Sequence, residues 1–175
     1  MHQWFMLTLV GKDQVGIVAK VTTVLYEGGC HLGEASMLRL GGNFTIMLMV
    51  SYQGTVQTLS NLLKPIQENL QLQIHIDNIV GQLHQHQEPN VRISVHGADR
   101  AGIVAQVTTA LAQAGLNILD LQSDVGGDEK KPFYVMHIEG VAMSGIDTLE
   151  VALQRLLLQQ NDLEVKLEPI ETVMM

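Results

Sequence analysis

Two loops of nearly identical sequence hold the residues of this chain that are best suited to bind a small anion. Residues 11–25 read GKDQVGIVAKVTTVL and residues 97–111 read GADRAGIVAQVTTAL, with ten of fifteen positions identical at an offset of 86. Each phrase places an aspartate where a helix N-cap is expected and a glycine in the first helical turn, at Asp13, Gly16, Asp99 and Gly102. Such a helix start presents free backbone N–H groups and can receive a carboxylate. The alternative is that tight strand-to-helix packing simply requires a small residue there.

Other reactive side chains lack the neighbours that catalysis requires. A nucleophile needs a base and a site for the developing charge within reach. The chain contains no G-x-G-x-x-G sequence and no P-loop lysine, and no nucleophile elbow surrounds the serines of the strand patterns, which are Ser36, Ser51, Ser94 and Ser123. Asp124, Asp128 and Glu129 crowd the second hairpin, but its GGDEKKP segment at 126–132 is typical of an exposed turn. We therefore expect that the protein is not an enzyme.

Cysteine and histidine do not indicate a metal site. Cys30 is the only cysteine, which excludes an internal disulfide and a cysteine-rich zinc site, and we expect it to be a packed or loop residue. His84 and His86 can in principle chelate a metal, but two histidines in a polar linker are weak evidence for a metal site. We expect no metal and no cofactor.

Charge and hydropathy restrict the possible partners. With 10 Lys and Arg against 18 Asp and Glu, the net charge is -8, and nucleic-acid affinity depends on clustered basic residues. We therefore expect no direct contact with nucleic acid. The longest apolar run, at 44–50, is far shorter than a membrane span, and residues 1–13 lack the features of a signal peptide. The expected location is the cytoplasm.

The same order of elements is predicted in each half of the chain. Strands at 3–10 and 90–96 run into the two loops, and helices follow with apolar residues on one face, namely Ile17, Val18, Val21, Val24 and Leu25, then Ile103, Val104, Val107 and Leu111. Gly29 and Gly115 stand where these helices should stop. Hairpins at 32–52 and 118–141, a second amphipathic helix and a final alternating strand complete each half, and Pro65 is expected to kink or restart its helix.

This order, βαββαβ, predicts an α+β protein of two ferredoxin-like domains with antiparallel sheets. We expect the first domain at residues 1–82, a polar linker at 83–90, the second domain at 91–171 and a short tail at 172–175.

Strand alternation predicts which sheet face packs on the helices. At an offset of 86, Phe5, Leu7 and Leu9 match Val91, Ile93 and Val95, which we assign to the helix-packed face. The opposite face reads Met6, Thr8 and Val10 in the first copy and Arg92, Ser94 and His96 in the second. At an offset of 89, Phe44, Ile46, Leu48 and Val50 match Phe133, Val135, His137 and Glu139, and we assign these to the open face as well.

An apolar open face of this size is unusual on a monomer. A second copy of the protein is the first candidate for its cover, which predicts a homodimer, and the alternatives are a partner protein or the tail. The interface residues predicted on this basis are Met6, Val10, Phe44, Ile46, Leu48 and Val50.

Both halves also resemble the ACT domain, a βαββαβ module that senses small molecules. DQVGIV at 13–18 and DRAGIV at 99–104 match its D-x-x-G-I/L loop, and AGLNI at 114–118 adds to the likeness, which covers nearly the whole chain. The resemblance implies that a small amino acid binds at the first strand-to-helix loop, often at the junction between two modules. The residues implied are Asp99, Arg100, Ala101, Gly102, Ile103 and Asn117 in the second copy, and Asp13, Gly16, Ile17 and His31 in the first.

The two copies differ at one of these positions. Asn117 stands where ACT sensors often use an amide, and His31 stands at the matching position of the first copy. An amide offers both donors and an acceptor, which suits the charged head of an amino acid. We therefore expect stronger binding in the second copy.

A tandem pair with no enzyme attached is similar to ACT regulators of transcription. This likeness implies glycine as the ligand and contact with a LysR-type transcriptional activator protein, rather than with DNA. The alternative is a regulatory subunit of an amino-acid metabolic enzyme.

Overall fold

The computed structural model of the chain describes residues 2–80, 87–98, 101–128, 131–160 and 162–170. It divides into two compact units, residues 1–83 and 84–175, which we call the first and the second module. The predicted tail at 172–175 and the first half of the predicted linker, 83–86, lie outside the described residues.

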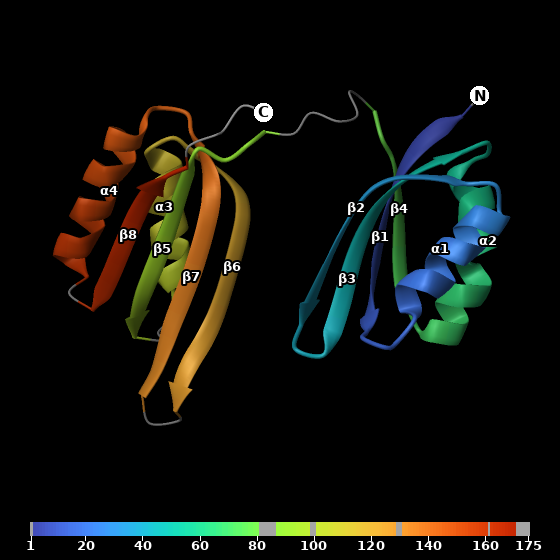
Figure 1. Cartoon of the computed structure of the whole chain (residues 1–175), viewed down its shortest axis with the longest axis horizontal. Coiled ribbons are helices and arrows are strands. Elements are labelled where there is room, and N and C mark those ends of the chain that lie inside the picture. Colours follow the sequence, from blue (N-terminus) through green and yellow to red (C-terminus); the bar gives the residue numbers. More distant parts are fainter. Residues whose placement is uncertain (1, 81–86, 99–100, 129–130, 161, 171–175) are drawn as a thin grey trace. The chain divides into compact units, whose positions relative to one another are not determined.

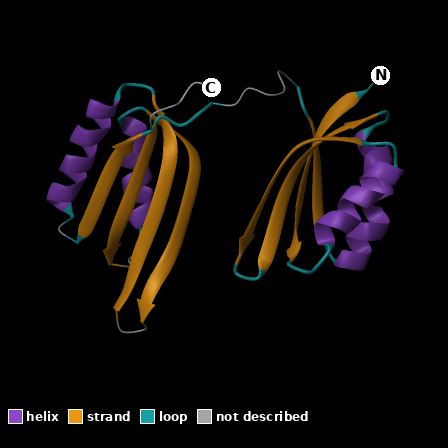
Figure 2. Cartoon of the chain, viewed as in Figure 1, coloured by secondary structure: helices purple, strands orange, loops and turns teal. Residues whose placement is uncertain are grey.

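Each module has the predicted βαββαβ order (Figure 1). The elements of the first module are β1 Gln3–Lys12, α1 Ile17–Glu27, β2 His31–Leu40, β3 Asn43–Tyr52, α2 Val56–Leu70 and β4 Gln73–Asn78. Those of the second are β5 Val91–Ala98, α3 Ile103–Gln113, β6 Leu116–Asp128, β7 Lys131–Ala142, α4 Ile146–Gln159 and β8 Leu163–Pro169. The antiparallel sheets have the orders β2-β3-β1-β4 and β6-β7-β5-β8, and two helices cover one face of each sheet (Figure 2). The predicted α+β, ferredoxin-like fold is confirmed.

Local sequence signals explain where the helices end. Gly29 and Gly115 have φ of 78° and 84°, a conformation that glycine adopts without steric cost. Beyond the end of α1, the Cys30 N–H donates to the Leu25 carbonyl at 2.9 Å, which satisfies one of the last helical carbonyls. Both predicted helix stops are confirmed. Pro65 lies inside α2, which continues through it as a single helix from Val56 to Leu70, so the predicted restart does not occur.

The central strands build the two cores. Phe5, Leu7 and Leu9 of β1 are fully buried, and so are Val91, Ile93 and Val95 of β5. They pack with buried residues of the helices, which are Ile17, Val21, Leu25, Leu59, Leu63 and Ile66 in the first module and Ile103, Val107, Leu111, Leu149, Leu153 and Leu156 in the second. The faces predicted for β1 and β5 agree with the structure.

The face predicted for β3 is wrong. Phe44, Ile46, Leu48 and Val50 are at most 4% exposed, because they lie under the helices rather than on the open face. The pairing of β3 with β1 sets Leu48 opposite Leu7 and Ile46 opposite Leu9, and residues directly opposite each other share a face. These four residues therefore cannot form the predicted interface.

An alignment slip of one residue caused this error. In the second module Ile138 lies opposite Ile93 and Met136 opposite Val95, so the equivalents of Leu48 and Ile46 stand at an offset of 90. Phe44 corresponds to the buried Tyr134, not to the exposed Phe133. A slip of one residue exchanges the two faces of a strand.

The open face of the first module is nevertheless more apolar than that of the second. It presents the predicted Met6 and Val10 together with Trp4, Met47 and Met49. The second module carries polar pairs on its two central strands, at the positions of Met6, Thr8, Met47 and Met49, namely Arg92 with Glu139 at 2.6 Å and Ser94 with His137 at 3.1 Å. The edge strands do not differ in this way, because Lys166 pairs with Glu168 at 2.8 Å in β8 and His75 Nε2 lies 3.0 Å from Asp77 Oδ2 in β4. The predicted contrast therefore persists, with different residues from β3.

We expect neighbouring residues of β3 to respond differently to truncation. Leu48 is 2% exposed and Met47 is 46% exposed. Leu48→Ala removes buried apolar volume and should lower the free energy of unfolding of the first module by about 2–5 kcal/mol, whereas Met47→Ala should change it by less than about 1 kcal/mol. Urea unfolding of the full chain measures both values, and equal effects would contradict the assigned faces.

Candidate functional site

Both repeated loops lead into a helix that starts at a glycine. Gly16 and Gly102 are the N-cap residues of α1 and α3, with φ of 80° and 88°, and no side chain caps either helix. The prediction that Asp13 caps α1 is wrong, because three residues separate it from Ile17, the first helical residue. Its carboxylate instead pairs with Arg39, and its N–H donates to the Gly42 carbonyl at 3.1 Å. Asp99 and Arg100 lie outside the described residues.

The space beside these glycines shows whether the loop needs a small residue for tight packing or leaves the helix start open to an anion. Among the described residues, a Cβ atom at Gly16 would meet no heavy atom of a non-neighbouring residue within 4 Å, and one at Gly102 would meet only the Gln106 Nε2 atom at 4.0 Å. Packing therefore does not demand a small residue at either position. The close approach lies instead at Gly11 and Gly97, where a Cβ would stand 2.6 Å from a methyl group of Leu72, just before β4, and of Leu163, the first residue of β8.

The loops consequently present an open helix start to solvent. Ile17 and Ile103 point into the two cores, while Ala101 is exposed and Val15 is fully exposed. The first N–H groups of a helix have no partner within the helix, and they favour an anion. In α1 the first of them, the Ile17 N–H, donates to the Gln14 carbonyl of the loop at 3.3 Å. In the part of the chain that the structure describes, no side-chain atom of a non-neighbouring residue lies closer than 4.0 Å to a Cβ at Gly16 or Gly102, which leaves room for a small carboxylate. Sequence reasoning missed Val15, an apolar side chain at the loop surface, and Arg39, which holds Asp13.

His31 and Asn117 lie at the other end of their modules. His31 pairs with Ser51, which lies opposite Trp4 near the start of β1, whereas the loop follows the end of β1. In the same way Asn117 pairs with Val141, next to the residue opposite Val91. The eight residues of β5 span roughly 25 Å at 3.3 Å per residue. The structure therefore does not bring either residue to the loop of its own module.

Each of these two residues contacts the segment that precedes the first strand of its module. The Asn117 amide donates from Nδ2 to Gln87 Oε1 at 2.8 Å. The His31 ring lies 5.9 Å from the ring of His2, whose Nδ1 and Nε2 atoms lie within hydrogen-bonding distance of Ser51 and Gln53. Gln87 and His2 are neighbours of the candidate residues that the sequence did not reveal.

Two other reactive groups do not form a catalytic site. Burial raises the pKa of the Cys30 thiol, which keeps it protonated and weakly nucleophilic at neutral pH. Ser94 Oγ lies 3.1 Å from His137 Nδ1, but Glu139, the neighbouring carboxylate, is held by Arg92 and does not orient the imidazole. Among the described residues no group of three or more His, Cys, Asp or Glu side chains can hold a metal ion.

The comparisons with known proteins agree with this architecture. Residues 3–77 and residues 91–156 each match the ACT domain. The chain belongs to the ACT-domain family. It is 24% identical to the glycine cleavage system transcriptional repressor of Escherichia coli over 144 residues, which cover 82% of this chain and 76% of that protein. This tandem ACT protein is therefore similar to a regulator along most of its length.

Two crystal structures share the fold of this ACT protein. A protein of unknown function from Galdieria sulphuraria superposes with a TM-score of 0.77 at 23% identity, over 98% of this chain and all of that one. A protein provisionally described as a glycine cleavage system transcriptional repressor gives a TM-score of 0.72 at 18% identity, over 98% of this chain and 99% of that chain. In the part of the chain that the structure describes, no helix is long and apolar enough to cross a membrane.

We expect both N-cap glycines of the ACT loops to be required by backbone conformation. Gly16→Ala and Gly102→Ala each place a Cβ in the left-handed region, which should lower the free energy of unfolding by roughly 1–2 kcal/mol. Urea unfolding measures the change. A gain in stability, as alanine gives where φ is negative, would contradict the assigned conformation.

Proposed function

We propose that this tandem ACT protein binds a small amino acid, glycine, and regulates transcription by contacting a LysR-type activator protein. The observation that carries the proposal is the pair of open helix starts at Gly16 and Gly102, with no heavy atom of a described, non-neighbouring residue closer than 4.0 Å to a Cβ at either glycine. The similarity to the glycine cleavage system transcriptional repressor supports the choice of ligand and of regulated process. The net charge of -8 supports action through a protein rather than through nucleic acid.

The geometry of each module limits how such a ligand is held. The carboxylate of an amino acid suits the N–H groups of a helix start, and an amide such as that of Asn117 suits the remaining polar atoms. These two groups stand roughly 25 Å apart in one module, which is far more than the length of a small amino acid. One module therefore cannot present both groups to the same small ligand.

Asn117 is the preferred amide donor of this proposal. Its Nδ2 atom already donates to Gln87 in the unliganded chain, which holds the side chain in one orientation. His31 offers a ring in contact with the ring of His2 and has no amide. Neither module is proposed to catalyse a reaction.

We expect Asn117→Ala to weaken binding of the amino acid more than His31→Ala. Loss of one or two hydrogen bonds to a charged ligand should raise the Kd about tenfold or more, while His31→Ala should change it less. Isothermal titration calorimetry of the full chain with glycine, then serine and the other amino acids, provides the measurement. Equal or reversed effects would remove the preference for the second copy, and no binding of any amino acid would overturn the proposed sensor.

We further propose that the chain forms a homodimer through the open sheet face of the first module. Trp4 lies over Gly33, where a Cβ would stand 2.8 Å from the indole ring, and the methionines of β1 and β3 continue this apolar surface. The open face of the second module cannot cover it without burying Arg92 and Glu139 beside apolar groups, which is costly. A second copy of the same apolar face is self-complementary about a two-fold axis.

A charge on this face should separate the two copies. Met47→Glu should convert the dimer to a monomer, because a carboxylate cannot be buried unpaired between two apolar sheets. The matched control is His137→Glu, at the equivalent position of the second module, which should leave the mass unchanged. Sedimentation equilibrium of both variants and of the native chain gives the mass. A native monomer, or an unchanged mass for Met47→Glu, would contradict this interface.

A further inference from the structure

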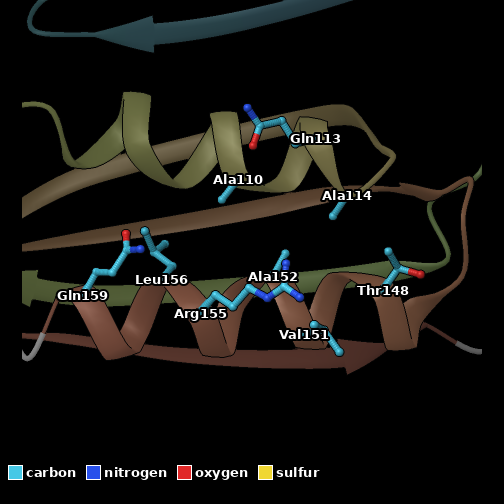
Figure 3. Close-up of a pocket in the computed structure, with 9 residues that line it drawn as sticks. All are labelled: Ala110, Gln113, Ala114, Thr148, Val151, Ala152, Arg155, Leu156 and Gln159. Carbon is cyan, nitrogen blue, oxygen red and sulfur yellow. The ribbon is translucent and has the colours of Figure 1, made fainter.

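The second module has a groove on its helical side, far from the open sheet face. It has a volume of about 380 Å³ and runs between α3 and α4 (Figure 3). Its lining is Ala110, Gln113 and Ala114 from α3 and its C-cap, and Thr148, Val151, Ala152, Arg155, Leu156 and Gln159 from α4. Figure 3 shows the side chains of Ala110 and Ala114 directed from α3 toward α4.

The groove is open because Ala110 and Ala152 are small. Larger residues fill the equivalent place in the first module. Val24 and Leu62 occupy the positions equivalent to Ala110 and Ala152, and both pack against the core of the first module. A Cβ at Gly28, the equivalent of Ala114, would stand 2.2 Å from Leu62 Cδ2. The Leu62 side chain therefore fills the space between the two helices of the first module. The same place is therefore filled by the chain itself in one copy and left open in the other.

A single cation lies in the groove. Arg155 stands where α2 has Pro65, and its side chain extends along α4 toward Ala152 (Figure 3). Within the described residues Arg155 has no ion-pair partner, and no carboxylate lines the groove. Glu150 is five residues away on the same helix, a spacing that does not bring two side chains together. In a chain of net charge -8, an arginine that lines a groove and has no ion-pair partner among the described residues marks a place for an external anion.

Exposed aliphatic side chains extend this surface along α4. Val151 is 48% exposed and Leu158 is 83% exposed. The equivalent positions of α2 hold Asn61 and Glu68, which suit a solvated surface. The helical side of the second module thus combines a floor of alanines, an apolar rim and one arginine, and the first module has none of the three.

We propose that the groove between α3 and α4 docks an amphipathic helix of a partner protein, with an acidic side chain of that helix on Arg155. Alanines in the floor let a third helix approach closely, the rim of Val151 and Leu158 covers its apolar face, and a carboxylate neutralises the arginine. The groove is open along its length, so it suits a helix laid across it better than a small molecule, which needs to be largely enclosed. This inference rests on the proposed function, because it gives the regulated partner protein a place to bind.

The test uses a photo-crosslinking amino acid in the full chain, expressed in its own cells. p-Benzoylphenylalanine at Gln113, at the end of the groove, should crosslink to a segment of a second protein that forms an amphipathic helix with an aspartate or glutamate. The matched control is the same substitution at Glu27, the equivalent position of the first module, which should give no such product. Mass spectrometry of the crosslinked peptide identifies the segment.

Two substitutions test whether the crosslink depends on Arg155 and on the space that Ala152 leaves in the groove. Arg155→Glu should lower the crosslink yield about tenfold or more, through repulsion of the acidic side chain, and exchanging that acidic residue of the partner for arginine should restore it. Ala152→Leu introduces the residue that fills the first module and should lower the yield similarly. Neither substitution should change the calorimetric affinity for the amino acid.

Several outcomes would overturn the inference. A crosslink to a second copy of this chain would make the groove an interface between copies. A yield that Arg155→Glu and Ala152→Leu leave unchanged would exclude the groove, and so would equal products at Gln113 and Glu27 or no product at Gln113. If the native chain binds an amino acid in the calorimeter but gives one of these crosslinking results, the proposed docking surface is wrong and the proposed sensor is unaffected. If the native chain binds no amino acid, the proposed function is wrong instead.

Discussion

One central strand in each module determines how everything else is arranged. β1 and β5 pair with a neighbour on both edges, and their alternate side chains are fully buried beneath two helices. Because successive side chains of a strand point to opposite faces, this single pairing decides which residues of the neighbouring strands enter the core and which face outward. The register of β1 with β3 is therefore the constraint on which the cores, the open faces and the predicted interface all depend.

The two copies keep this scaffold and differ in what they place on it. Their cores use apolar residues at equivalent positions, and their first loops begin a helix at a glycine with positive φ. The central strands of the open sheet face carry Met6, Met47 and Met49 in the first module, whereas those of the second carry the Arg92–Glu139 ion pair. The helical side is filled by Leu62 in the first module and hollow at Ala152 in the second. The chain therefore has two copies of the loop, and each module has its own open sheet face and its own helical side. These surfaces can differ between the modules because surface substitutions cost little stability.

The candidate ligand residues also show why one module is not enough for the proposed site. The helix start and the Asn117 amide stand at opposite ends of the sheet, because β6 runs parallel to β5 and begins where β5 begins. A small amino acid is far shorter than this separation, so one module cannot present both groups to it. The repetition of the loop sequence is consistent with this limit.

The sequence by itself determined the order of the elements, the helix stops at Gly29 and Gly115 and the buried face of β1. These depend on local conformational preference and on a periodicity that is read within one element. The tertiary structure decided the rest. Phe44 entered the core because its pairing with β1, and not the likeness to Phe133, sets its face. Asp13 forms an ion pair with Arg39 and does not cap the helix. The groove beside Arg155 depends on the sizes of Ala110 and Ala152, which lie on two helices and become neighbours only when the chain folds.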